Sequence, residues 1–274
     1  MISFENVNLN YSEGTPFAQS ALKGVSFNIL EGELVGVIGH TGSGKSTLAQ
    51  LMCSLLVPSS GDILVGGMNT KDKKQVKKIR SQVSMVFQYP EHQIFEETVM
   101  QEIAFGPKNL EREVQEVEED VRWAMEVMEL PIEMGDKSPF DLSGGQKRKV
   151  AIASIVAMKP KILILDEPTA GLDPGGRRKL LELIRFLHKK LNMGIIIISH
   201  SMEDVAQVAN RVLVLNKGKI FMDGTVPEVY SRAEELKSIN LDIPEATHLT
   251  KMLEVKECYT VQEAVVAIRE DMPC

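Results

Sequence analysis

Short apolar runs predict the buried strands of this chain. Residues 34–38, 83–87, 162–165 and 194–198 are largely apolar. Runs of four or five such residues, bounded by polar residues or glycine, are typical of strands inside a sheet. A glycine or a polar side chain follows each run, so we expect chemistry at the carboxyl ends of these strands.

Apolar residues at helical spacing predict the other elements. Residues 46–56 are expected to form a helix, and a mostly helical insertion should lie between residues 88 and 143. In the second helix of this insertion, apolar residues that share one face are expected to be buried: Val114, Val117, Val121, Ala124, Met125 and Met128. Residues 2–29 read as short strands around a loop at 12–20.

The composition changes after Gly224, where strands cease and three short helices are expected. They cover residues 227–240, 243–254 and 260–271, and a Thr-x-x-Glu capping box opens the last one at 260–263. The apolar face of that helix is formed by Val261, Ala264, Val265 and Ile268. Such a small segment can hardly bury a core of its own, so it should pack on the main domain or on a second subunit.

A phosphate-binding loop follows the first apolar strand. Its pattern G-x-x-x-x-G-K-S is formed by Gly39, His40, Thr41, Gly42, Ser43, Gly44, Lys45 and Ser46. The glycines allow successive backbone N–H groups to point inward at a phosphate, next to the N-terminus of the following helix. We expect Lys45 to reach the β- and γ-phosphates and the Ser46 hydroxyl to bind Mg²⁺.

Two carboxylates end the strand at 162–165. Asp166 suits Mg²⁺, which prefers oxygen ligands. Glu167 should point elsewhere, because side chains alternate along a strand, and it can polarise a water toward the γ-phosphate. His200 follows the strand at 194–198 in the same way, and we expect it to contact the γ-phosphate.

A second anion site is predicted at the start of another helix. The segment Leu142-Ser143-Gly144-Gly145-Gln146 precedes an apolar helix, so free N–H groups and the positive end of the helix dipole face outward. On its own this segment would equally suit an ordinary helix N-cap. The other motifs along the chain, which are the phosphate loop, the two carboxylates and His200, favour an anion site.

Charge and cysteine content exclude some alternatives. The formal net charge of −7 argues against non-specific nucleic-acid binding. Residues 71–80 are basic but contain no aromatic residues that could stack on bases, so they are expected to form a solvated face. Cys53, Cys258 and Cys274 show no metal-ligand spacing and read as free thiols in a reducing, cytoplasmic compartment. No apolar run approaches the roughly 18 residues that span a bilayer.

The order of these motifs resembles the nucleotide-binding subunit of an ATP-binding-cassette (ABC) transporter. The resemblance covers residues 1 to about 222 and implies an α/β P-loop NTPase core, with an antiparallel β flank and a helical subdomain at about 89–150, followed by a small helical domain at 223–274. It implies that Gln88 senses Mg²⁺ and water and that Tyr11 stacks on adenine. The residues that would contact ATP are Tyr11, Gly39, His40, Thr41, Gly42, Ser43, Gly44, Lys45, Ser46, Thr47, Ser143, Gly144, Gly145, Gln146 and Asp173.

The same resemblance implies a dimer and a division of roles. Glu167, His200 and Gln88 would be catalytic, and Ser46, Gln88 and Asp166 would bind Mg²⁺. Residues 143–146 of one subunit would cap the ATP held by Lys45 of another ABC ATPase subunit, which could be a copy of this chain or a different one. The C-terminal segment would serve dimerisation or packing.

Residues 87–99 and 104–109 are similar to the corresponding region of energy-coupling-factor (ECF) importers, and the segment Gly14-Thr15-Pro16-Phe17 and the C-terminal helices resemble their second type of ATPase subunit. This implies a peripheral protein at the cytoplasmic face of the membrane, with a transmembrane coupling subunit and a substrate-binding membrane subunit, that powers import of vitamins or transition-metal ions. The alternatives are the ATPase of another ABC importer, a non-transport ABC ATPase, and a nucleotide-binding regulator without turnover.

The segment after Gln88 is also the expected membrane-partner docking site. Pro90 suits the first turn of a helix. Carboxylates at positions 91, 96, 97 and 102 surround apolar residues at 94, 95 and 99. We expect an acidic surface around an apolar contact, which would fit a partner with arginines.

Overall fold

The larger of two β-sheets contains the phosphate-loop strand. The computed structural model describes residues 1–271. Six strands form this sheet in the order β10 (Lys219–Thr225), β9 (Arg211–Asn216), β3 (Leu34–Ile38), β8 (Gly194–Ile198), β7 (Ile162–Asp166) and β6 (Val83–Val86). Strands β9, β3, β8, β7 and β6 run parallel, and β10 pairs with β9 in the antiparallel sense. All four strands that the apolar runs predict are therefore neighbours in one sheet.

The parallel strands of this sheet are apolar at nearly every position because both faces of the sheet are buried. In β7, Ile162 and Ile164 face one hydrophobic cluster, whereas Leu163 and Leu165 face another. Because side chains alternate along a strand, only a strand covered on both sides requires apolar residues at every position. The first cluster lies toward the smaller sheet, and the second lies beneath the helices.

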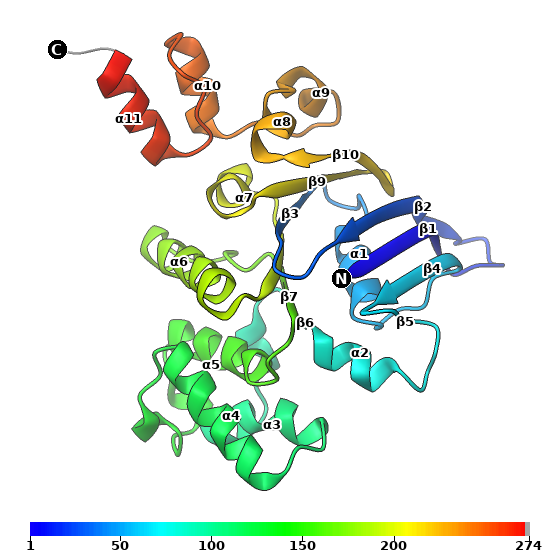
Figure 1. Cartoon of the computed structure of the whole chain (residues 1–274), viewed down its shortest axis with the longest axis vertical. Helices are drawn as coiled ribbons and strands as arrows, with labels where there is room; N and C mark the ends of the chain where they lie inside the picture. The colour runs from blue at the N-terminus through cyan, green and yellow to red at the C-terminus, as the bar shows by residue number, and fades with distance from the viewer. Residues whose placement is uncertain (272–274) are drawn as a thin grey trace.

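The N-terminal residues form the antiparallel flank. The smaller sheet has the order β2 (Gln19–Ile29), β1 (Ile2–Tyr11), β4 (Ser60–Val65) and β5 (Met68–Asn69), and it packs with α1 (Lys45–Met52) on one side of the larger sheet (Figure 1). The loop expected at residues 12–20 lies between β1 and β2, but these are two long strands, whereas the sequence predicted short ones. Helix α1 ends four residues earlier than the pattern suggests, because Ser54 has a left-handed backbone with φ of 53°.

Helices cover the other face, and a group of them projects beyond the edge of the sheet that β6 forms (Figure 1). Helix α2 (Val76–Gln82) is on the side of the smaller sheet, since its Ile79 belongs to the hydrophobic cluster on that side. The other helices in this part of the chain are η1 (Pro90–Gln93), α3 (Val99–Asn109), α4 (Val114–Val127), η2 (Ile132–Met134), η3 (Pro139–Asp141), α5 (Gly144–Val156), α6 (Pro174–Leu191) and α7 (Met202–Val208). Helices α3, α4 and α5 pack on one another. The predicted buried face of α4 is confirmed except at Val114, which is 74% exposed.

Up to residue 271, the C-terminal segment has four helices rather than three: α8 (Val226–Tyr230), α9 (Ala233–Ser238), α10 (Glu245–Met252) and α11 (Val261–Asp271). Residues 226–230 and 233–238 are separate because the chain turns at Ser231 and Arg232. Tyr230, Leu236 and Ile243 join the main hydrophobic cluster, so the start of the segment packs on the main domain.

Helices α10 and α11 instead share a small cluster of Ala246, Cys258, Ala264 and Ala267. The expected apolar face of α11 is therefore only partly buried, since Val261 and Val265 are exposed. Cys53 and Cys258 are free and buried, whereas Cys274 lies outside the described residues. Over residues 1–271 the helices are all too short or too polar to cross a membrane.

One glycine fixes the distance between the phosphate-loop strand and α7. A Cβ atom at Gly36 would lie 2.3 Å from Cγ1 of Val205, a buried β-branched side chain with little freedom to move. Gly36→Ala should therefore lower the free energy of unfolding by about 1–3 kcal/mol. Gly175→Ala is the control, since a Cβ there meets only Asp173 at 3.6 Å and should stabilise α6 by up to about 1 kcal/mol. Urea denaturation of both variants measures the difference, and equal midpoints would contradict this packing argument.

Candidate functional site

The phosphate loop connects β3 to α1 and is held in its shape by glycine. Gly42 and Gly44 have φ of 79° and 109°, a region that other residues rarely adopt. At Gly44, a Cβ would also lie 2.8 Å from the backbone oxygen of Ala21 on β2. The loop therefore bends as the motif predicts, and α1 begins directly at Lys45.

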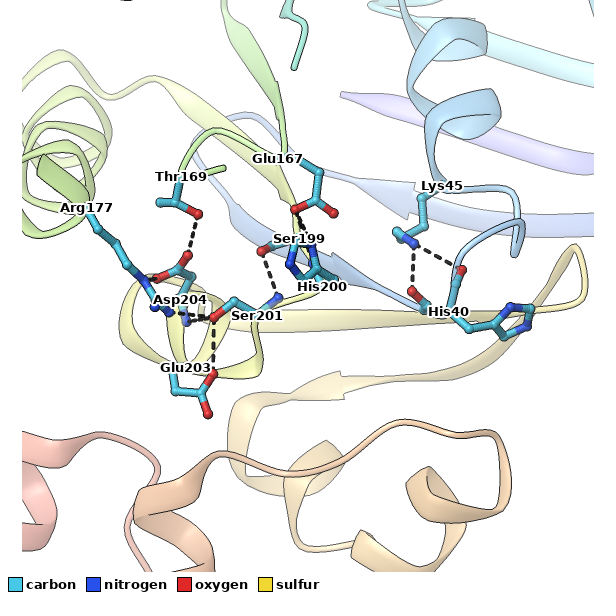
Figure 2. Close-up of polar contacts among 11 residues, drawn as sticks. His40, Lys45, Glu167, Thr169, Arg177, Ser199, His200, Ser201, Glu203 and Asp204 are labelled. Atoms are coloured by element: carbon cyan, nitrogen blue, oxygen red, sulfur yellow. Dashed lines mark hydrogen bonds and ion pairs between the residues drawn. The ribbon is translucent and has the colours of Figure 1, made fainter. Parts of the chain in front are cut away.

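The Lys45 ammonium lies inside the curve of this loop. Its Nζ donates to the backbone oxygens of Gly39, at 2.6 Å, and His40, at 3.1 Å (Figure 2). Burial lowers the pKa of Lys45, and the nearby carboxylates of Glu167 and Asp166 partly offset that effect. The loop thus places a partly buried cation beside two carboxylates.

Asp166, the last residue of β7, lies beside Ser46. Burial raises the pKa of Asp166, and the charge of Glu167 acts in the same direction, whereas the Ser46 hydroxyl and Lys45 lower it. A buried carboxylate beside a hydroxyl and a second carboxylate forms an oxygen-rich group with excess negative charge. This chemistry fits a divalent cation with oxygen ligands.

Glu167 leaves the strand in an unusual backbone conformation. Its φ is 47°, and this left-handed turn directs the side chain toward the loop after β8. There the Glu167 carboxylate accepts a 2.7 Å hydrogen bond from Nδ1 of His200, as Figure 2 shows. A strained residue that the surrounding structure holds in place is typical of a functional site.

A cavity of 460 Å³ brings most of the predicted residues together. Its lining includes the predicted residues Tyr11, Thr41, Gly42, Gly44, Lys45, Ser46, Thr47, Gln88, Asp166, Glu167 and His200. Gln19, Ser20 and Ala21 also line it, and the sequence analysis missed them. Strand pairing could have found them, because Gln19 lies directly across the hairpin from Tyr11.

The aromatic ring of Tyr11 is anchored to the phosphate-loop helix. The hydroxyl groups of Tyr11 and Thr47 lie 3.1 Å apart and share a hydrogen bond. This bond connects β1 to the second residue after Lys45. It places a partly exposed aromatic ring at the rim of the cavity, where a flat base could stack on it.

Other predicted residues do not line this cavity. Gly39, His40 and Ser43 lie in the loop but outside the lining, and Asp173 caps α6 by accepting a 2.6 Å hydrogen bond from Gly176 N. Ser143 and Gln146 form a capping box at the start of α5, with the Ser143 N–H donating to Gln146 at 3.0 Å. Gly144 and Gly145 are exposed, and a Cβ on either would meet nothing within 4 Å.

A buried network fixes the loop that carries His200. Asp204 is 1% exposed and accepts hydrogen bonds from Thr169 Oγ1, at 2.6 Å, and Arg177 Nε, at 2.5 Å. Arg177 also donates to Ser201, the residue after His200 (Figure 2). The turn after Glu167, the start of α6 and the His200 loop are thereby joined.

Arg148 of α5 joins three further segments. Its buried guanidinium forms a two-point ion pair with Glu91 of η1, at 2.8 and 2.9 Å. The guanidinium also donates to the backbone oxygen of Ala170, at 3.1 Å, and to that of Pro168, at 3.3 Å. Both residues lie just after Glu167. Arg148 was not among the predicted site residues, although it lies two positions after the predicted anion site.

The predicted acidic docking surface is only partly correct. Glu91 is paired with Arg148, and Glu102 is 5% exposed because its carboxylate accepts hydrogen bonds from the backbone of residues 95 and 96. The side chains at 94 and 99 are buried in the core. Phe95 remains exposed and stacks edge-on against Phe105, with ring centroids 4.8 Å apart.

The parallel sheet, glycine loop and paired carboxylates define a P-loop nucleotide-binding protein, and comparison with known proteins specifies the class further. The family model described as ABC transporter matches residues 22–170. The energy-coupling factor transporter ATP-binding protein EcfA2 of Caldanaerobacter subterraneus is 52% identical, over 96% of this chain and 94% of that protein. The EcfA2 protein of Clostridium perfringens is 50% identical, over 98% of this chain and 97% of that protein.

Solved structures agree with this class. The structure of cbiO1 from Clostridium perfringens, described as part of the ABC transporter complex cbiONQ, has a TM-score of 0.76 and 37% identity, and covers 91% of this chain and 98% of that one. A dimeric post-hydrolysis state of the ATP-binding cassette MJ0796, bound to ADP and Pi, has a TM-score of 0.73 and 28% identity, and covers 82% of this chain and 99% of that one. The chain therefore belongs to the ABC transporter family, and within it to the energy-coupling factor ATP-binding proteins. It is an ABC-type ATPase, as the motif order predicts.

Removing Arg148 should cost far more stability than removing its neighbour Lys149. Arg148→Met would leave Glu91 without its cation in a partly buried position, and the free energy of unfolding should fall by about 3 kcal/mol. Lys149 pairs with Glu129, which is 86% exposed, so Lys149→Met should cost less than about 1 kcal/mol. Urea denaturation at pH 7 compares the two variants, and a similar loss in both would contradict this difference.

The same pair predicts a pH dependence. Burial raises the pKa of Glu91, but its hydrogen bond and ion pair with Arg148 outweigh that effect and hold the pKa below its ordinary value. A carboxylate with a lowered folded-state pKa adds stability above its unfolded-state pKa and loses it as the pH falls through the folded-state value. In Arg148→Met burial acts on Glu91 without the cation and gives it a higher pKa than in the parent, so the stability difference between the two proteins should shrink as the pH falls through about 4.5. Denaturation curves at several pH values check this, and a difference that is constant with pH would contradict it.

Proposed function

We propose that this chain binds and hydrolyses Mg²⁺-ATP at the cytoplasmic face of a membrane, as a peripheral subunit that powers an ECF-type importer of vitamins or transition-metal ions. The observation that carries the proposal is the convergence of Lys45, Asp166, Glu167 and His200 on one cavity. The cavity volume of 460 Å³ suits a nucleotide with its triphosphate in the glycine loop.

The oxygen ligands around the loop fit Mg²⁺. Ser46 and Asp166 lie together, and Gln88 lines the same cavity. When bound, Mg²⁺ would neutralise charge on the β- and γ-phosphates. The carboxylate of Asp166 is buried beside that of Glu167, and a cation bound there would balance their charge.

The side chains at the strand ends have complementary roles in this proposal. Lys45 exchanges its contacts with the loop oxygens for contacts with the β- and γ-phosphates. Glu167 accepts a proton from the attacking water, so the water becomes a better nucleophile. His200 donates from Nδ1 to Glu167 and so orients it, and when both ring nitrogens carry a proton, Nε2 can donate to the γ-phosphate.

The second anion site supports a composite active site between two ATPase subunits. Gly144 and Gly145 face open space, so packing within the described part of this chain does not require glycine at either position. Glycine is suited to a surface that another molecule approaches closely. We infer that Ser143 to Gln146 cap ATP bound to a second subunit and that the partner is a copy of this chain or a second ABC ATPase.

Phe95 and Phe105 are the proposed contact with the transmembrane coupling subunit, which in turn joins a substrate-binding membrane subunit. Both rings are exposed, and they lie in the first part of the insertion that begins after Gln88. Glu97 remains an exposed acidic residue beside them. We further propose that residues 1–222 act as the ATPase core, with its helical subdomain at about 89–150, and that the segment from 223 onward serves packing and dimerisation.

Two substitutions separate nucleotide binding from hydrolysis. Lys45→Ala should lose ATP binding, because the triphosphate loses its cation inside the loop. Glu167→Gln should still bind ATP but hydrolyse it at least about a hundredfold more slowly, because the amide cannot accept a proton from water. Equilibrium binding and phosphate release measure the two effects. Near-normal turnover by Glu167→Gln would contradict the proposed role.

The composite site can be tested in the slow Glu167→Gln background. ATP should shift this chain from monomer to dimer in size-exclusion chromatography, since ATP is bound between the subunits. Ser143→Arg places bulk and charge in the proposed cap, so the same chain should remain monomeric with ATP. Dimerisation of the Ser143→Arg chain would exclude the cap, and a monomeric Glu167→Gln chain would require a second type of ATPase subunit.

Docking to the membrane partner should depend more on Phe95 than on Glu97. An exposed ion pair contributes only about 0.2–1 kcal/mol, whereas a large apolar side chain buried at an interface contributes more. Phe95→Ala should therefore reduce recovery of the membrane complex in a pull-down more than Glu97→Gln does, and only the Glu97 contribution should weaken with salt. Parent-like recovery with Phe95→Ala would exclude this segment as the docking site.

A further inference from the structure

The turn between β9 and β10 supports the phosphate loop from behind. The Gly218 N–H donates to the backbone oxygen of Ser43 at 3.0 Å, and the Lys23 N–H donates to the backbone oxygen of Gly218 at 2.8 Å. A Cβ at Gly218 would lie 2.6 Å from the backbone oxygen of Ala21. The turn is therefore held between β2 and the loop, and it contacts the loop through backbone atoms.

His40 adds a side-chain bond between the same two segments. Its Nε2 lies 3.1 Å from Oδ1 of Asn216, the last residue of β9, and its Nδ1 lies 2.8 Å from the backbone oxygen of Thr41. Figure 2 shows the ring pointing away from Lys45, while the His40 backbone oxygen accepts a hydrogen bond from Lys45. One residue thus connects the end of β9 to the cation inside the loop.

We propose that His40 is a positioning residue that holds the phosphate loop in its nucleotide-binding shape by hydrogen bonding to Asn216; this inference rests on the proposed ATP binding at the loop. His40 does not contact the nucleotide through its ring. It acts through the backbone between Gly39 and Thr41, whose position determines where the loop N–H groups point.

The Asn216 amide suits this role because it can bond either form of the ring. A neutral His40 that donates from Nδ1 to Thr41 needs a donor at Nε2, and the amide NH₂ supplies one after a turn of the side chain. A doubly protonated ring instead needs an acceptor, which the amide oxygen supplies. The bond between the loop and β9 can therefore persist through a change in the protonation of His40.

The conformational freedom of the loop before ATP binds affects its affinity for ATP. A loop with several accessible shapes must be ordered on binding, and that ordering reduces affinity. The His40–Asn216 bond restricts the loop in advance, at a point three residues before Ser43 and its contact with Gly218. Loss of the bond should weaken ATP binding and raise KM while kcat changes less, because Glu167 and His200 remain in place.

Two amide substitutions of His40 separate the bond to Asn216 from the bond to Thr41. In His40→Gln the amide can reach the position of Nε2, so the contact with Asn216 is kept. In His40→Asn the amide matches Nδ1, so only the contact with Thr41 is kept. Equilibrium binding of a fluorescent, non-hydrolysable ATP analogue should show an affinity about three- to tenfold weaker for His40→Asn, but within about twofold of the parent for His40→Gln.

A double-mutant cycle with His40→Ala and Asn216→Ala tests the pair directly. Because both single changes break the same bond, the double variant should bind the analogue no more weakly than the worse single variant. Melting temperatures without nucleotide should agree among His40→Asn, His40→Gln and the parent, which distinguishes positioning from general destabilisation. Equal affinity of His40→Asn and the parent, equal weakening in both amide variants, or additive effects in the cycle would overturn the inference.

The parent and Lys45→Ala proteins distinguish this inference from the proposed function. If the parent failed to bind the analogue, or bound it as Lys45→Ala does, the proposed ATP site itself would be wrong. If the parent bound the analogue, Lys45→Ala did not, and His40→Asn bound like the parent, only the role of His40 would be overturned.

Discussion

The parallel register of β3, β8 and β7 is the constraint on which the whole site depends. Val37 of β3 and Asp166 of β7 both pair with Ile198 of β8, so the three strands end at the same level. The glycine loop, Glu167 and His200 leave the sheet at this edge. A one-residue slip would turn the side chains of one strand to the opposite face, and apolar residues on both faces keep the strands inside the sheet.

Two charged networks hold the segments that follow the strands in place, which the sheet alone does not do. Asp204 and Arg177 join the turn after Glu167 to the His200 loop, and Arg148 joins that turn to Glu91. Each pairs a buried charged group with an opposite charge and with backbone or hydroxyl partners, as buried charges require. Because Glu91 lies just before the exposed Phe95, the proposed docking segment and the turn after Glu167 share one rigid connection.

Local patterns allowed the sequence to predict the sheet, the glycine loop and the strand-end residues. An apolar run, a glycine motif or a carboxylate pair lies within a few neighbouring positions, so its meaning does not depend on the fold. Contacts between distant positions were missed: Arg148 and Glu91 are 57 residues apart. Glu102 was misassigned to the surface although its partners are only six and seven residues away, since the sequence alone does not show that two backbone N–H groups meet its carboxylate.

The difference between local patterns and distant contacts also applies to the phosphate loop, which needs support that its motif does not show. Glycines allow the loop to bend, but they also allow many other shapes, and this freedom must be lost when a ligand binds. The structure compensates with neighbours from elsewhere in the chain: β2 behind Gly44, the β9–β10 turn behind Ser43, and Asn216 beside His40. The motif therefore specifies which shape is possible, and residues far away in sequence favour that shape over the others.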